Sequence, residues 1–130
     1  MINKDSGLRV VGANEKLGLP RGKMVKVTIA FDVDGTLRDN RDDAKVKKPI
    51  AFEDIRTLLR ILRKFKNTKI VVWSGSGELY ARQIANELHI SHWVHEYWDK
   101  KDQTNPMPDI AIDDIQDTAI GRINLIVREK

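Results

Sequence analysis

The chain has 130 residues, the length of one domain, and its 41% hydrophobic and 32% charged residues are typical of a soluble globular protein. It contains no cysteine, which excludes disulfides and thiolate zinc sites. No apolar stretch approaches the roughly 20 residues of a membrane span, and the first residues lack a secretory signal, so we expect a cytoplasmic protein that binds no membrane. The net charge of +4 favours anionic partners such as nucleic acid or phosphorylated metabolites, although solubility alone explains it equally well.

Residues 1–23 differ from the rest of the chain. They hold four glycines, one proline and scattered charges, and they show neither helical nor strand periodicity. We therefore predict an N-terminal arm or tail over residues 1–23 and one folded domain over residues 24–130.

This domain alternates predicted strands with predicted helices. The first strand (MVKVTIAFDV) becomes almost wholly apolar, as in a strand that is covered on both faces. Apolar residues recur at helical spacing in two segments, and in the second of them Leu79, Ile84 and Leu88 are expected to face the core. The predicted elements are strands at 24–33, 69–73, 91–98, 109–112 and 124–128, and helices at 52–66, 77–89 and, in a short form, 117–121.

Strands that alternate with helices predict an α/β domain with a mostly parallel, five-stranded sheet. Because crossovers between parallel strands are right-handed, we expect helices on both faces, in a Rossmann-like three-layer α/β/α sandwich. Ligands of such sheets bind at the carboxyl ends of the strands, where the strand order changes direction. This rule selects residues 32–37, 74–77 and 113–114 as the place to look for a site.

Two acidic residues, Asp32 and Asp34, stand where the first strand breaks into the turn Gly35-Thr36-Leu37. Two carboxylates this close repel each other unless a proton or a cation separates them, and Mg²⁺ is the usual cation for oxygen ligands beside a phosphate. Gly35 permits the unusual backbone angles that such a turn needs. Taken alone, an Asp-x-Asp pair is more often a polar turn than a metal site.

The other two selected strand ends also carry polar groups. Residues 74–77 (SGSG) lead from a strand into a helix and offer hydroxyl and N–H groups to a phosphate, or simply an N-cap to the helix. Asp113 and Asp114 end a buried strand, where acids are costly unless they lie at the rim or meet a cation. Each motif alone is ambiguous, but together they bring acid, hydroxyl and acid to one edge of one sheet.

The order of these motifs resembles the haloacid dehalogenase-like (HAD) superfamily: Asp-Val-Asp-Gly-Thr-Leu at 32–37, then a hydrophobic strand with Ser74, then a hydrophobic strand with Asp113-Asp114. The resemblance covers about residues 25–128. It implies a Mg²⁺-dependent phosphomonoester hydrolase that works through an aspartyl-phosphate. The roles it implies are nucleophile for Asp32, general acid and base for Asp34, metal ligands for Asp32, Asp34 (through its carbonyl), Asp114 and the adjacent Asp113, and phosphate ligands for Ser74, Gly75 and Lys100.

Two features depart from the pattern of the family or leave it ambiguous. The family's lysine between the serine and the last acids is either Lys100 or Lys101, and the segment from there to Asp113 is too short for the family's usual helix. No segment has room for a cap domain. The resemblance therefore implies an open site, which suits large substrates such as phosphorylated nucleic-acid ends, or needs a second copy of the chain to cover it; nucleotides and sugar phosphates stay open as substrates.

Other residues invite functional readings that the sequence does not favour. The basic side chains after the first motif could guide an anionic polymer, but acids lie among them, so a solvated loop is favoured. A histidine metal site is disfavoured because a strand would split the histidines between its faces, and aromatic residues could pack in the core or stack on bases. The residues concerned are Arg38, Arg41, Lys45, Lys47 and Lys48 in the loop, His89, His92 and His95, and Trp73, Trp93, Trp98, Tyr80 and Tyr97.

Two other functions compete with a phosphatase. A nuclease-type or topoisomerase-primase-like fold also uses Asp-x-Asp at a strand end, but it needs a glutamate on an early strand, and only Glu15 precedes Asp32. The other alternative is a catalytically silent HAD-like binding module, a nucleic-acid-interacting protein or a phosphoacceptor switch. The presence of both Asp32 and Asp34 argues against a silent module.

Overall fold

The computed structural model describes residues 26–39, 51–115 and 120–128. The predicted arm, loop residues 40–50 and most of the helix predicted at 117–121 lie outside these ranges. Neither of the described helices is long and apolar enough to cross a membrane. The described elements are β1 (Val27–Asp32), α2 (Glu53–Leu62), β2 (Thr68–Ser74), α3 (Glu78–Glu87), the 3₁₀ turn η1 (Ser91–Trp93), β3 (Glu96–Asp99), β4 (Ile110–Asp113) and β5 (Ile123–Ile126).

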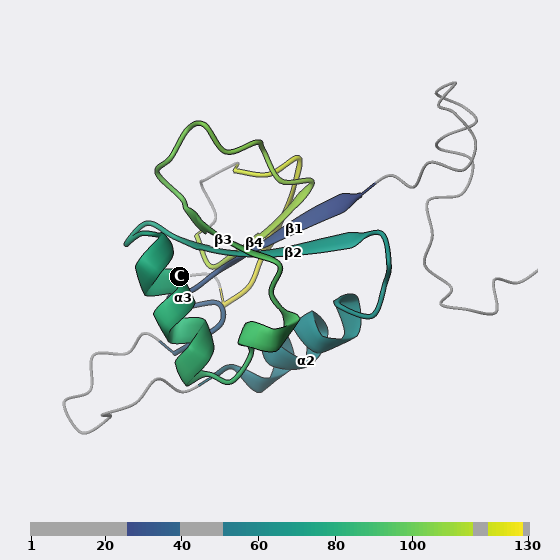
Figure 1. Ribbon diagram of the computed structural model, residues 1–130, viewed down its shortest axis with the longest axis vertical. Coiled ribbons are helices and arrows are strands. Elements are labelled where there is room, and N and C mark those ends of the chain that lie inside the picture. The colour runs from purple at the N-terminus through teal and green to yellow at the C-terminus, as the bar shows by residue number, and fades with distance from the viewer. Residues whose placement is uncertain (1–25, 40–50, 116–119, 129–130) are drawn as a thin grey trace, which may run out of the picture.

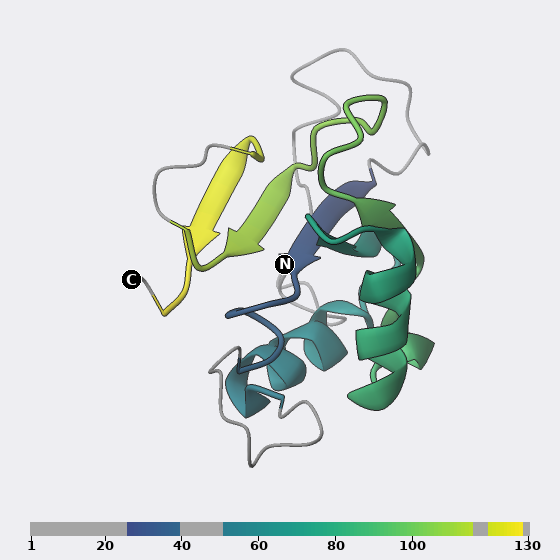
Figure 2. The same ribbon diagram turned by 90° about the vertical axis from the view of Figure 1, so that its left-hand side faces the viewer.

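The five described strands form one parallel sheet in the order β3-β2-β1-β4-β5, which confirms the predicted α/β class and the five-stranded sheet. The chain moves outward from β1 to β2 and β3, and then returns to the other side of β1 as β4. The strand order therefore changes direction between β1 and β4, which run side by side in Figure 2. This is the position at which open parallel sheets bind ligands.

Both helices pack against the same face of the sheet (Figure 1). Alternate residues of the strands point to this face, and each helix adds an apolar stripe with a period close to 3.6 residues. The buried residues of this core include Ile29, Phe31, Ile70, Val72 and Ile112 from the strands, Ile55 and Leu59 from α2, and Ala81, Ile84, Ala85 and Leu88 from α3.

The opposite face of the sheet is lined by Trp73 and Trp98, which meet edge to face at 6.2 Å, and by small residues of β1 and β4. The connection from β3 to β4 crosses this side as a loop, as expected from the short segment before Asp113. Within the described residues, helices therefore cover only one face, so the structure shows the sheet and one helical layer of the predicted sandwich.

Two local predictions were wrong. Leu79 was expected to face the core, but its side chain is 79% exposed. It lies two residues before Ala81, which places it on the side of α3 opposite the buried stripe. The strand predicted at 91–98 begins only at Glu96, because Ser91–Trp93 form a 3₁₀ turn that carries the chain from α3 back to the sheet.

Candidate metal and phosphate site

Three buried carboxylates meet at the carboxyl ends of β1 and β4. Asp32, Asp113 and Asp114 each place one oxygen within 4.8 Å of the others. The strand register explains part of this arrangement, because Asp32 and Asp113 each lie two residues after a small residue (Ala30, Ala111) that pairs with its counterpart across the sheet. Their side chains therefore point to the same face. The prediction that these three acids lie close together is confirmed.

Lys100 binds two of the three acids. It follows β3 directly, and its Nζ donates to Asp32 Oδ1 at 2.6 Å and to Asp113 Oδ2 at 2.8 Å. The indole ring of Trp73 lies below the same ammonium, 5.7 Å from Nζ. Lys101, the other lysine considered from the sequence, is exposed. The structure therefore places Lys100, and not Lys101, among the acids.

Burial sets the protonation of this group. Asp32 is 7% exposed. Burial raises its pKa to about 6, against the attraction of Lys100 and with a contribution from the neighbouring Asp113 and Asp114. Burial alone would lower the pKa of Lys100, but the charges and hydrogen bonds of Asp32 and Asp113 outweigh it and raise that pKa. The site is thus a carboxylate cluster held around one permanent cation.

The turn after β1 brings Asp114 against the first motif. The carbonyl of Val33 accepts hydrogen bonds from the N–H groups of Thr36, Leu37 and Arg38, which closes the turn tightly. Gly35 has a φ of +85°, and a Cβ at this position would collide with the carboxylate of Asp114. Only glycine satisfies both conditions, which gives the predicted conformational role of Gly35 a second, steric reason.

Asp34 is oriented by a helix that the sequence did not connect with it. Tyr80, in the first turn of α3, donates its hydroxyl to Asp34 Oδ1 at 2.9 Å. Arg38 donates to the same Tyr80 oxygen at 3.2 Å and lies 3.7 Å from Asp34 Oδ1. The carboxylate of Asp34 is not a member of the three-acid group. The sequence offers one indication of the role of Tyr80. It lies in the first turn of the helix that follows the Ser74 loop, and the start of such a helix lies at the carboxyl edge of the sheet, where the acids are.

Ser74 and Gly75 lie beside Lys100. Ser74 is buried, and its Oγ accepts a hydrogen bond from the N–H of Ser76 at 3.0 Å, which leaves its hydroxyl proton for another acceptor. The carbonyl of Ser74 accepts the N–H of Lys100 at 2.9 Å, so the serine loop and the lysine are joined through the backbone. Gly75 is half-buried beside the Lys101 side chain. The predicted phosphate ligands thus lie next to one another.

This group of acids could hold a metal ion. Its three carboxylates supply the oxygen ligands that hard divalent cations prefer. Lys100 neutralises one negative charge, so ionised acids leave a surplus that a divalent cation would balance. Asp113 Oδ1 already accepts the N–H groups of Asp114 and Ile115, which fixes its orientation. Asp32, Asp113 and Asp114 are thus the carboxylates that could hold a metal, and Asp113 also binds Lys100.

The remaining candidates lie elsewhere. Among the described residues, the three acids form the only cluster suited to a metal, so His89, His92 and His95 do not make one. Trp73 and Trp98 are buried in the core, while Trp93 is half-buried beside Arg56. Glu15 and loop residues Arg41, Lys45, Lys47 and Lys48 lie outside the described ranges.

Comparisons with known proteins identify no relative of this chain. No family model, no curated protein and no solved structure matches it.

Proposed function

We propose that this chain is a Mg²⁺-dependent phosphomonoester hydrolase with a HAD-like, capless fold, and that Asp32 is its nucleophile. One observation carries the proposal: the buried Asp32 carboxylate ends the central strand at the switch point, with Lys100 at 2.6 Å and two further acids beside it. A purely structural cluster of this kind is costly, because three buried acids lie beside one half-buried lysine that pairs with only two of them. We also propose that the chain is HAD-like, with a second helical layer on the other face of the sheet.

The proposed reaction has two displacements at phosphorus. An oxygen of Asp32 attacks the phosphorus, and the bond from phosphorus to the leaving oxygen breaks. Water then attacks the phosphorus of the aspartyl-phosphate, which releases inorganic phosphate and restores Asp32. With a pKa of about 6 in the metal-free chain, Asp32 is already mostly ionised at neutral pH, as a nucleophile must be. A magnesium ion held by Asp32, Asp114 and the Asp34 carbonyl would supply charge neutralisation.

Asp34 moves the proton in both steps. It protonates the leaving oxygen in the first displacement and accepts a proton from water in the second. Within the described residues its contacts with Tyr80 and Arg38 use only Oδ1, so Oδ2 is the oxygen for this exchange. Ser74, the N–H of Gly75 and Lys100 bind the phosphate oxygens. When the phosphate binds, Lys100 weakens its hydrogen bond to Asp32 and donates to a phosphate oxygen instead.

The decisive experiment measures phosphate release from an aryl phosphate, with Mg²⁺ and with a chelator, for the native chain and Asp32→Asn. We expect metal-dependent release that falls by at least about 10³-fold in the variant, because no nucleophile remains. Release that survives the substitution would exclude Asp32. An absence of release from aryl phosphates, nucleotides and phosphate-ended oligonucleotides alike would instead favour the binding module.

A further inference from the structure

A group of exposed cations lies at the amino ends of β1 and β2, away from the acidic site. Lys26 precedes β1, and its Nζ donates to the carbonyl of Lys66 at 3.5 Å. Lys69, near the start of β2, pairs in register with Thr28 of β1, two residues after Lys26. Arg63 and Lys66 lie in the connection from α2 to β2. The basic cluster, as we use the term, consists of Lys26, Arg60, Arg63, Lys64, Lys66 and Lys69.

The charge of the basic cluster is not balanced locally. The described residues contain as many acidic as basic side chains, so this concentration of cations reflects their placement and not an overall excess. Within the described ranges, Lys69 is the one member that forms an ion pair, at 2.5 Å with Glu96. The dipole of α2 favours cations near its last turn, such as Arg60 and Arg63. It does not explain Lys26, which directly precedes β1, or Lys69, which lies near the start of β2.

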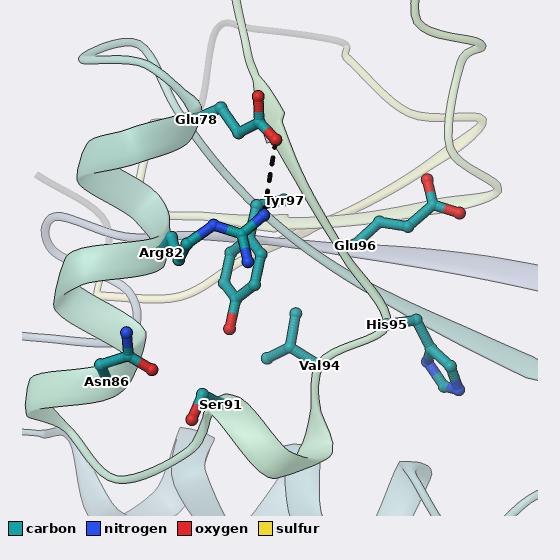
Figure 3. Close-up of a pocket in the computed structure, with 8 residues that line it drawn as sticks. All are labelled: Glu78, Arg82, Asn86, Ser91, Val94, His95, Glu96 and Tyr97. Atoms are coloured by element: carbon teal, nitrogen blue, oxygen red, sulfur yellow. Dashed lines mark ion pairs between the residues drawn. The ribbon is translucent and has the colours of Figure 1, made fainter.

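A hollow of about 500 Å³ adjoins the basic cluster, between α3 and β3 (Figure 3). The ring of Tyr97 forms part of its wall, and the guanidinium of Arg82 lies over that ring at 4.6 Å, held by Glu78 at 3.6 Å. Asn86 and Ser91 add an amide and a hydroxyl lower in the hollow. The hollow meets the amino end of β2: His95, which lines it, accepts the N–H of Ile70 at 2.8 Å, and Glu96, which also lines it, pairs with Lys69.

We propose that the basic cluster and this hollow bind single-stranded nucleic acid, with the phosphates on the cations and one base against the Arg82 guanidinium over Tyr97. Binding of single strands combines backbone neutralisation by cations with stacking of bases on aromatic rings or guanidinium planes. The volume of the hollow is in the range of small-ligand sites, and its amide and hydroxyl groups can donate to and accept from a base edge. A duplex would keep its bases stacked and could not place one there. The inference does not depend on the proposed phosphatase, because none of these residues touches the acidic site.

The test is fluorescence anisotropy of the full chain with a labelled single strand of about 10 nucleotides, titrated at several salt concentrations without Mg²⁺. Arg63→Gln should weaken binding and lower the slope of log affinity against log salt by about 0.7, the value for one phosphate contact. Arg122→Gln removes one exposed cation outside the cluster and is the matched control. Equal effects of the two substitutions would overturn the basic cluster as the binding surface.

The hollow is tested by substituting its aromatic wall. Tyr97→Leu should weaken binding about tenfold without changing the salt slope, because it removes the ring on which the Arg82 guanidinium lies and removes no charge. Tyr97→Phe keeps the ring and should bind as the native chain does. Inorganic polyphosphate that competes as well as the oligonucleotide, together with unchanged affinity in Tyr97→Leu, would overturn the base site. Binding to vesicles of anionic phospholipid, but not to the oligonucleotide, would overturn the nucleic-acid partner altogether.

Discussion

The two ends of the parallel sheet carry opposite charge in opposite surroundings. At the carboxyl ends, Asp32, Asp113 and Asp114 are buried, and Asp32 and Asp113 share Lys100 through short hydrogen bonds. At the amino ends, the basic cluster is exposed or half-exposed and, within the described residues, largely free of ion pairs. Buried charges are expensive and need fixed partners, whereas exposed charges cost little. The acidic end can therefore perform chemistry that depends on geometry, while the basic end suits binding that depends on the number of charges.

The largest effect should follow from removing the one cation of the acidic end. Lys100→Met leaves three carboxylates without their ammonium and should lower the free energy of unfolding by about 3–5 kcal/mol, because a buried charge loses its partner. Mg²⁺ should restore part of this stability. The matched control, Lys101→Met, changes an exposed lysine and should alter stability by less than about 0.5 kcal/mol. Denaturant unfolding measures both, and equal losses would contradict the role of Lys100.

Removing the charge of Asp32 should instead raise the free energy of unfolding at neutral pH. Because its pKa is raised to about 6, the folded state holds this proton more tightly than the unfolded state does. The metal-free native chain should therefore lose stability as pH rises from about 4 to about 6, by an amount near 3 kcal/mol. Asp32→Asn should lack this loss and be the more stable protein at pH 7, yet gain less from Mg²⁺. A variant that is less stable than the native chain at pH 7 would show that burial does not destabilise the ionised Asp32.

A smaller effect is expected where α3 touches the acidic end. Tyr80→Phe removes the hydroxyl that orients Asp34 and should slow hydrolysis of an alkyl phosphate about tenfold, which is part of the roughly 10²–10⁴-fold that a well-placed general acid contributes. An aryl phosphate should be affected less, because its leaving group needs no proton. Tyr97→Phe is the control, because Tyr97 lies in β3 and does not donate to Asp34. Equal losses with both substrates would indicate a structural role for Tyr80 and not a role in positioning the acid.

The sequence could predict the contents of the acidic end better than those of the basic end. Parallel strands end at one edge, so the proximity of Asp32 and Asp113 follows from strand order and register. Lys100 reaches the same edge because it comes directly after β3, although β2 lies between β3 and β1. Their chemical roles stay predictions. The contact of Tyr80 with Asp34 depends on which side of α3 faces the core. The sequence pattern placed Leu79 on the core side, whereas its side chain is exposed, so it could not place Tyr80 correctly either. The basic cluster joins Lys26, the end of α2 and the start of β2, which come together only after folding, so no local pattern indicates it.

The smallest expected effect is a change in the pKa of His95, which lies at the basic end of the sheet. Burial, followed by Arg63 and Lys26, lowers the pKa of His95 below its usual value, against Glu96, which raises it. Its Nδ1 accepts the N–H of Ile70 at 2.8 Å, a bond that requires the neutral ring at that nitrogen. The stability that this bond contributes is present above about pH 6.5 and is lost as the pH falls through the lowered pKa.

Neutralising the surrounding cations should therefore raise the pKa of His95 toward 6.5. An NMR titration of the imidazole should show this rise in Arg63→Gln, and also in the native chain when a single-stranded oligonucleotide is added, because its phosphates would oppose the same cations. Arg122→Gln should leave the titration unchanged. A rise in the Arg63 variant without one on adding the oligonucleotide would show that the cations do act on His95 but that the phosphates bind elsewhere. In that case the difference between the two ends of the sheet would be electrostatic without being functional.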